Sequence, residues 1–156
     1  RLIICGYHPI ELMISILLAL ILVIVLIAIY IGLLTNAFYT IDHLSRFILG
    51  LVLIGFVYGS YGLLVGSLIK MELEGVLMIV LLVNIDVGWL QNPLFYAEAQ
   101  NQIIIKFLPA YFPSQTAIIT AVTDYSASTA ILNSLLYGFV FLSFSMLIFF
   151  YKMRTK

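Results

Sequence analysis

The chain has 156 residues, of which 64% are hydrophobic and only 9% are charged, and its formal net charge is zero. About a quarter of the residues in a soluble domain are charged, so this composition excludes an ordinary water-soluble protein. A neutral chain also lacks the basic field that attracts nucleic acid. Cys5 is the only cysteine, which excludes an internal disulfide and a cysteine-rich metal site.

The first residue is Arg rather than Met, and no signal-peptide n-region precedes the first apolar run. We therefore expect a C-terminal fragment whose N-terminal helices are missing, with residues 1–156 forming one transmembrane domain.

Three long apolar runs predict membrane-spanning helices. Leu12–Leu34 is 23 residues long without a charge, and a helix needs about 20 residues to cross a bilayer core. Its Leu, Ile, Val and Ala side chains predict a lipid-facing helix. Phe47–Ile69 and Ala130–Tyr151 are runs of the same kind.

The second run carries a stripe of glycines at helical spacing. The stripe consists of Gly55, Gly59, Gly62 and Gly66. Small residues at this spacing let two helix backbones approach closely in lipid. The stripe is either a seam between subunits or a packing surface within one subunit, and we favour the second interpretation.

Val76–Leu90 is a shorter run that Asn84 and Asp86 interrupt. A carboxylate inside a bilayer costs about 2.5–3.5 kcal/mol on insertion scales. Asp86 either lies with Asn84 on a substrate pathway, or lies at the outer end of the helix and caps a break before Gln91-Asn92-Pro93. On a straight helix the two side chains point about 200° apart, so they share a face only where the helix breaks.

Residues 92–128 are too polar to span a membrane and too apolar for a free loop. Their apolar pieces are short and are separated by Pro109 and Pro113, which predicts re-entrant or interfacial helices. Ser114 is a candidate N-cap for a helix through Val122, and Ser126 or Ser128 for the last span. The predicted fold is an all-α polytopic membrane bundle with about four spans and these short helices on the outer side.

The basic residues predict the orientation. With four crossings, five of the seven basic residues lie on one side. We place residues 1–10, 70–75 and 152–156 in the cytoplasm, and 35–46 and 92–128 outside. His8 and His43 then lie on opposite sides of the membrane and cannot share a metal.

Enzymatic motifs are absent from the sequence. It contains neither a P-loop nor H-E-x-x-H, and only one aspartate lies within a predicted span. An intramembrane enzyme would need a second titrating group near Asp86. We expect no catalytic residue, no metal site and no cofactor in this chain.

The order of several weak features resembles the permeases of type-2 ABC exporters. Arg1, Gly6 and Glu11 precede a Leu-rich span, as they do before the third membrane helix of that family. The glycine-rich span ending before Lys70 is similar to the fourth helix. An interrupted fifth helix, Leu108-Pro109, a Pro-aromatic stretch, a final helix and a basic tail follow.

The resemblance implies a coupling segment at residues 1–10, which would dock on a cytoplasmic ATPase subunit. The positions that would fill this role are Arg1, Gly6, Tyr7, His8 and Glu11. The family does not expect Pro9 there, but proline is tolerated in a first helical turn, so Pro9 is expected to begin the third helix. Without the resemblance, this segment is either a docking surface, with Glu11 at the positive end of the helix dipole, or an ordinary interfacial flank.

The resemblance further implies an outer gate formed by Asn84, Asp86, Pro109 and Pro113. The predicted function is export of a hydrophobic or amphipathic substrate by alternating access across a bacterial cytoplasmic membrane. The implied partners are an ATPase subunit, which holds the ATP and Mg²⁺, and a second permease copy or paralogue. The alternative is a non-transporting membrane scaffold or assembly subunit.

Overall fold

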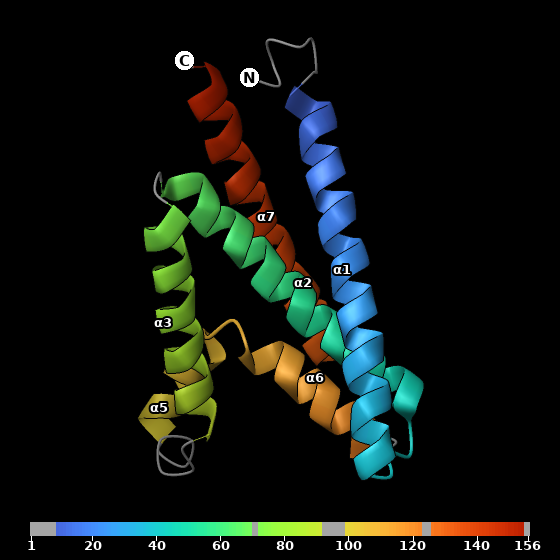
Figure 1. Ribbon diagram of the computed structural model, residues 1–156. Coiled ribbons are helices and arrows are strands. Elements are labelled where there is room, and N and C mark those ends of the chain that lie inside the picture. The colour runs from blue at the N-terminus through green and yellow to red at the C-terminus, as the bar shows by residue number, and fades with distance from the viewer. Residues whose placement is uncertain (1–8, 70–71, 92–98, 123–125, 155–156) are drawn as a thin grey trace.

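The computed structural model describes residues 9–69, 72–91, 99–122 and 126–154, which form six α-helices (Figure 1). The helices are α1 (Pro9–Phe38), α2 (Leu44–Leu68), α3 (Glu72–Gln91), α5 (Ala99–Lys106), α6 (Tyr111–Val122) and α7 (Ser128–Arg154). The predicted all-α fold is confirmed for this part of the chain.

Three of these helices, α1, α2 and α7, are long and apolar enough to cross a membrane. They contain the three long apolar runs of the sequence, and α1 begins at Pro9. α3 has 20 residues and carries Glu72, Glu74 and Asp86, and it is not among the candidate spans found in the described residues. Three candidate spans are therefore established among the described residues, and the fourth stays a prediction.

The long helices alternate in direction (Figure 1). The start of α1 and the ends of α2 and α7 lie together, and we call this the terminal end. The turn between α1 and α2 lies at the opposite end with α5 and α6, and we call this the loop end. α3 runs from the terminal end to the loop end, antiparallel to α2.

Helix α2 is the centre of the bundle and packs against α1, α3, α6 and α7. Its glycines allow these close approaches. A Cβ atom on Gly55 would lie 2.5 Å from Ile24 of α1, and one on Gly50 would lie 2.5 Å from the Ala117 Cα of α6. Close backbone packing of this kind replaces the hydrophobic drive that lipid does not supply.

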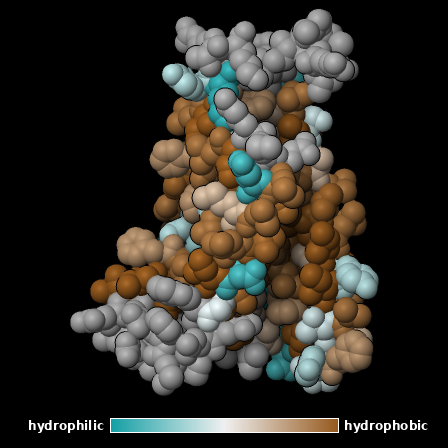
Figure 2. Space-filling view, turned by 60° about the vertical axis from the view of Figure 1, so that its left-hand side comes forward, coloured by the Kyte–Doolittle hydropathy of each residue, from teal (hydrophilic) through white to brown (hydrophobic). Residues whose placement is uncertain are grey.

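The face shown in Figure 2 is broadly apolar where the chain is described, and many large hydrophobic side chains are exposed. Large side chains on α1 are more than half exposed, among them Leu18 at 62% and Leu26 at 60%. Apolar patches larger than a few hundred Å² are rare on soluble monomers. This surface therefore fits the three candidate spans, with lipid rather than water around them.

Two local predictions are wrong. Ser114 does not cap α6, because the helix begins three residues earlier at Tyr111 and the Ser114 hydroxyl donates to the Tyr111 carbonyl. Pro113 is tolerated in the first turn because amides there need no partner within the helix. The N-cap of α7 is Ala127 rather than Ser126 or Ser128, because the Ala127 carbonyl accepts the first helical bond, from the Ile131 N–H at 2.9 Å. α3 runs unbroken past Asn84 and Asp86 and ends at Gln91.

Candidate functional site: a buried carboxylate at the start of helix α6

Asp86 is buried inside the helix bundle, with only 2% of its surface exposed. It lies on α3, five residues before the end of that helix. Burying a carboxyl group is costly unless hydrogen bonds compensate it. Its partners therefore show what the surrounding helices do for this side chain.

One carboxyl oxygen of Asp86 joins three segments. Oδ2 accepts a hydrogen bond from the Tyr58 hydroxyl of α2. It also accepts one from the Ala110 backbone N–H, at 3.0 Å. A single oxygen thus connects α2, α3 and the turn that leads into α6.

The bond to Ala110 caps α6 from another helix. The Ala110 carbonyl accepts the first helical bond, from the Ser114 N–H at 3.0 Å, so Ala110 occupies the N-cap position. Helix N-termini carry unsatisfied N–H groups and a partial positive charge, and both favour a carboxylate. Asp86 therefore stabilises the start of α6 and holds it against α3.

A second bond holds the same turn from α7. The Tyr137 hydroxyl donates to the Phe107 carbonyl. The Tyr137 ring lies 6.3 Å from that of Phe112 and 5.4 Å from that of Phe141. The turn between α5 and α6 is thus held by α3 through Asp86 and by α7 through Tyr137. We call this group the Asp86 cluster: Tyr58, Asp86, Phe107, Ala110 and Tyr137.

The other carboxyl oxygen of Asp86 is buried without a hydrogen-bond partner among the described residues. Most buried polar atoms have a partner, and each exception needs an explanation. Oδ1 can carry a proton, or it can accept a bond from a water molecule or a donor group. The site therefore keeps one unused acceptor beside a helix N-terminus.

The residues predicted to form the gate are only partly brought together. Pro109 directly precedes Ala110, whose amide binds Asp86, and Pro113 lies buried in the first turn of α6. Asn84 is exposed, and its amide donates to the Val80 carbonyl of its own helix. Because α3 is unbroken, Asn84 and Asp86 lie on different faces, and Asn84 does not join the cluster.

The predicted glycine stripe on α2 has two halves that differ in how closely they are packed. Gly55 and Gly59 face α1 of the same chain, and a Cβ on Gly59 would lie 3.1 Å from Leu20. A Cβ on Gly62 would reach only Ile79 of α3, at 3.9 Å, and one on Gly66 would meet nothing within 4 Å. The loop-end half of the stripe is closely packed, and the terminal-end half is open.

Of the predicted coupling residues, Arg1, Gly6, Tyr7 and His8 lie outside the described residues. Glu11 is exposed in the first turn of α1, at the terminal end. In the part of the chain that the structure describes, no three His, Cys, Asp or Glu side chains come together to hold a metal ion.

Tyr58 and Tyr137 were not among the predicted site residues. A buried tyrosine hydroxyl usually finds a hydrogen-bond partner, so tyrosines inside apolar runs were an available signal. Ala110 had no such signal, because it acts through its backbone amide. Only the path of the turn between α5 and α6 places that amide beside Asp86.

Comparisons with protein-family models, curated proteins and solved structures found no match for this chain.

Proposed function

We propose that this chain is the membrane-spanning permease subunit of an ATP-binding-cassette exporter in a bacterial cytoplasmic membrane. It moves a hydrophobic or amphipathic substrate by alternating access. A separate ATPase subunit supplies the ATP hydrolysis, and a second permease copy or paralogue completes the pathway. The proposal gives α3 the role of a fourth span, and α5 and α6 the role of re-entrant helices on the outer side.

The observation that carries the proposal is the Asp86 cluster. Two short helices lie at the loop end, and the turn between them is held by polar bonds from α3 and α7. Such bonds can break and re-form without unfolding the long helices. A rigid-body movement of α3 or α7 driven from the terminal end would therefore open or close the loop end.

The first experiment tests the functional coupling of this chain to an ATPase subunit. The proposal requires an ATPase subunit, which is sought in the reading frames beside this chain, co-expressed and purified with it, and assayed for ATP turnover in nanodiscs. Glu11→Ala is expected to lower turnover several-fold, because Glu11 lies in the first turn of α1 at the terminal end. Glu74→Ala is the matched control, since Glu74 is an exposed carboxylate in the first turn of α3. Equal turnover in an intact complex for both variants would contradict the coupling role.

The scaffold alternative makes the opposite prediction for Asp86. A scaffold needs only packing. Asp86→Leu would leave the Tyr58 hydroxyl and the Ala110 amide without their partner, which costs about 1–3 kcal/mol, so the complex would melt at a lower temperature but keep its function. Under the transport proposal, Asp86→Leu also leaves the ATPase bound but uncouples ATP turnover from opening at the loop end. A distance between spin labels at Thr40 and Ser126 measured with and without ATP distinguishes the two.

A further inference from the structure

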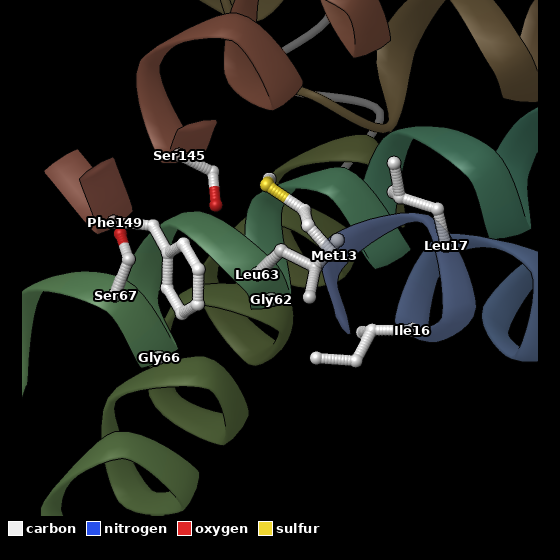
Figure 3. A pocket seen from close by; sticks show the side chains of 9 residues that line it. All are labelled: Met13, Ile16, Leu17, Gly62, Leu63, Gly66, Ser67, Ser145 and Phe149. Carbon is white, nitrogen blue, oxygen red and sulfur yellow. The ribbon is translucent and has the colours of Figure 1, made fainter. Parts of the chain in front are cut away.

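A cavity of about 210 Å³ lies among α1, α2 and α7 at the terminal end, away from the Asp86 cluster (Figure 3). Figure 3 shows side chains from α1 and α7 converging over the open part of the glycine stripe on α2. The cavity is lined by Met13, Ile16, Leu17, Gly62, Leu63, Gly66, Ser67, Ser145 and Phe149.

The lining favours an apolar occupant. Most of it is hydrocarbon or thioether, and the Ser67 hydroxyl is already bonded to the Leu64 carbonyl at 2.7 Å. An apolar cavity of about 150 Å³ stays dry in a protein and takes up small hydrophobic molecules. This larger cavity offers poor partners for water and many contacts for a hydrocarbon chain.

The cavity reaches the surface of the bundle. Ile16 is 43% exposed, and Gly66 is exposed as well. These residues belong to candidate spans, and in a helix that crosses the membrane the surface outside the opening faces lipid. A hydrocarbon chain can therefore enter from the bilayer without crossing water.

A positive charge lies next to the cavity. The Lys152 ammonium donates to the carbonyls of Ser67 and Leu68, the second at 3.0 Å, and Ser67 lines the cavity. Basic side chains at a span end lie at headgroup level and attract lipid phosphates. Glu11 and Glu74 lie at the same end of the bundle and carry negative charge. The attraction for a lipid phosphate is therefore confined to the surroundings of Lys152.

We propose that this cavity binds one acyl chain of a membrane phospholipid, whose phosphate lies beside Lys152. The bound lipid fills the gap that Gly62 and Gly66 leave between α1, α2 and α7. The proposal goes beyond the proposed function, because such a site requires neither ATP nor a partner subunit.

The test uses the purified chain in nanodiscs that contain phosphatidylglycerol with a diazirine in one acyl chain. After irradiation, labelled residues are identified by mass spectrometry. Met13 and Phe149 in the cavity are compared with Leu26, which is 60% exposed on α1 and reports ordinary lipid contact. With the probe as a minor component, added unlabelled phosphatidylglycerol is expected to lower cavity labelling at least threefold more than Leu26 labelling, because it competes for a saturable site and only dilutes general lipid contact. An equal fall would show that the cavity holds no specific lipid.

Gly66→Leu fills the cavity, and no atom lies within 4 Å of its Cβ to oppose the change. We expect labelling of Met13 and Phe149 to fall at least fivefold while Leu26 labelling stays constant. Gly88→Leu on α3 is the matched control, because Gly88 is exposed like Gly66, its Cβ also has nothing within 4 Å, and it does not line the cavity. Unchanged cavity labelling in Gly66→Leu would overturn the site.

The phosphate is tested with a diacylglycerol that carries the same diazirine. It is expected to label the cavity at least threefold less than phosphatidylglycerol does. Lys152→Gln should abolish this difference, and Lys152→Arg should retain it. Equal labelling by the two probes in the unaltered chain would overturn the role of Lys152.

Discussion

At the scale of single residues, Asp86 is a buried carboxyl group in a mainly apolar helix bundle. Its Oδ2 atom accepts bonds from Tyr58 and from the Ala110 amide, and Oδ1 is buried without a described partner. One carboxyl group therefore determines the position of the α6 N-terminus relative to α2 and α3. The free-energy cost of burying this carboxyl group is offset by two hydrogen bonds, one from a phenolic hydroxyl and one from a backbone amide at a helix N-terminus.

A double-mutant cycle measures the bond between Tyr58 and Asp86. Tyr58→Phe, Asp86→Leu and the double variant are unfolded in mixed micelles. We expect a coupling energy of about 0.5–2 kcal/mol, the range found for side-chain hydrogen bonds inside membrane proteins and for bonds to charged groups. Tyr58→Phe alone should destabilise, because it removes one of the two bonds to Oδ2. Additive effects of the two single changes would contradict a direct bond.

Tyr137→Phe tests the second bond to the turn between α5 and α6. Losing its hydroxyl should speed hydrogen exchange of the Ala110 and Tyr111 amides about fivefold, which corresponds to about 1 kcal/mol of local stability. Tyr61→Phe is the matched control. Tyr61 also packs between α2 and α7, with its ring 5.4 Å from Phe141, and no hydrogen bond joins its hydroxyl to another described residue. Equal exchange in both variants would mean that Tyr137 does not hold the turn.

At the scale of helices, glycines on α2 and α7 determine how closely neighbours approach. A Cβ on Gly138 of α7 would lie 2.3 Å from the Phe56 ring, whereas one on Gly50 of α2 would meet the backbone of Ala117 at 2.5 Å. A ring can turn aside, but a backbone moves only with its helix. Gly50 is therefore the position at which the packing of α2 against α6 tolerates an added side chain least.

Gly50→Ala is expected to destabilise the bundle by about 1–3 kcal/mol, the usual cost of overpacking. Gly66→Ala makes the same chemical change on the same helix where the Cβ has open space. It should be neutral or stabilise by about 0.5–1 kcal/mol, because alanine favours helix. The melting temperatures of the two variants are compared by thermal unfolding in detergent. Similar melting temperatures would contradict the close approach of α2 and α6.

At the scale of the whole molecule, the question is whether α3 crosses the membrane. Three helices qualify as candidate spans by length and composition. α3 lies beside α2 and runs in the same direction as α1 (Figure 1). If α3 crosses, the turn after α1 and the start of α7 lie on the same side. If α3 stays on one side, they lie on opposite sides.

Cysteine labelling decides between these topologies. In a Cys5→Ser background, Thr40→Cys and Ser126→Cys place thiols at exposed positions before α2 and α7. An impermeant maleimide added to intact cells should label both, and should label Tyr151→Cys only after the cells are opened. Labelling of Thr40→Cys without Ser126→Cys would show three crossings and would remove the re-entrant role of α5 and α6.

By itself, the sequence determined the apolar helices and their approximate ends. Runs such as Leu12–Leu34 need no tertiary partner to be recognised, because an unbroken apolar stretch satisfies its own backbone only as a helix in lipid. The importance of Asp86 was also visible, since a carboxylate within an apolar run is costly wherever it lies.

Only the tertiary structure decided what Asp86 binds and which glycines are packed. The hydrogen-bond donors to its Oδ2 come from positions 28 and 24 residues away, and one of them is a backbone amide that no sequence pattern marks. Gly55 and Gly66 look alike in the sequence, yet one lies against Ile24 and the other opens into a cavity. Periodicity places residues on a helix face, but the neighbour that covers that face depends on how the helices cross.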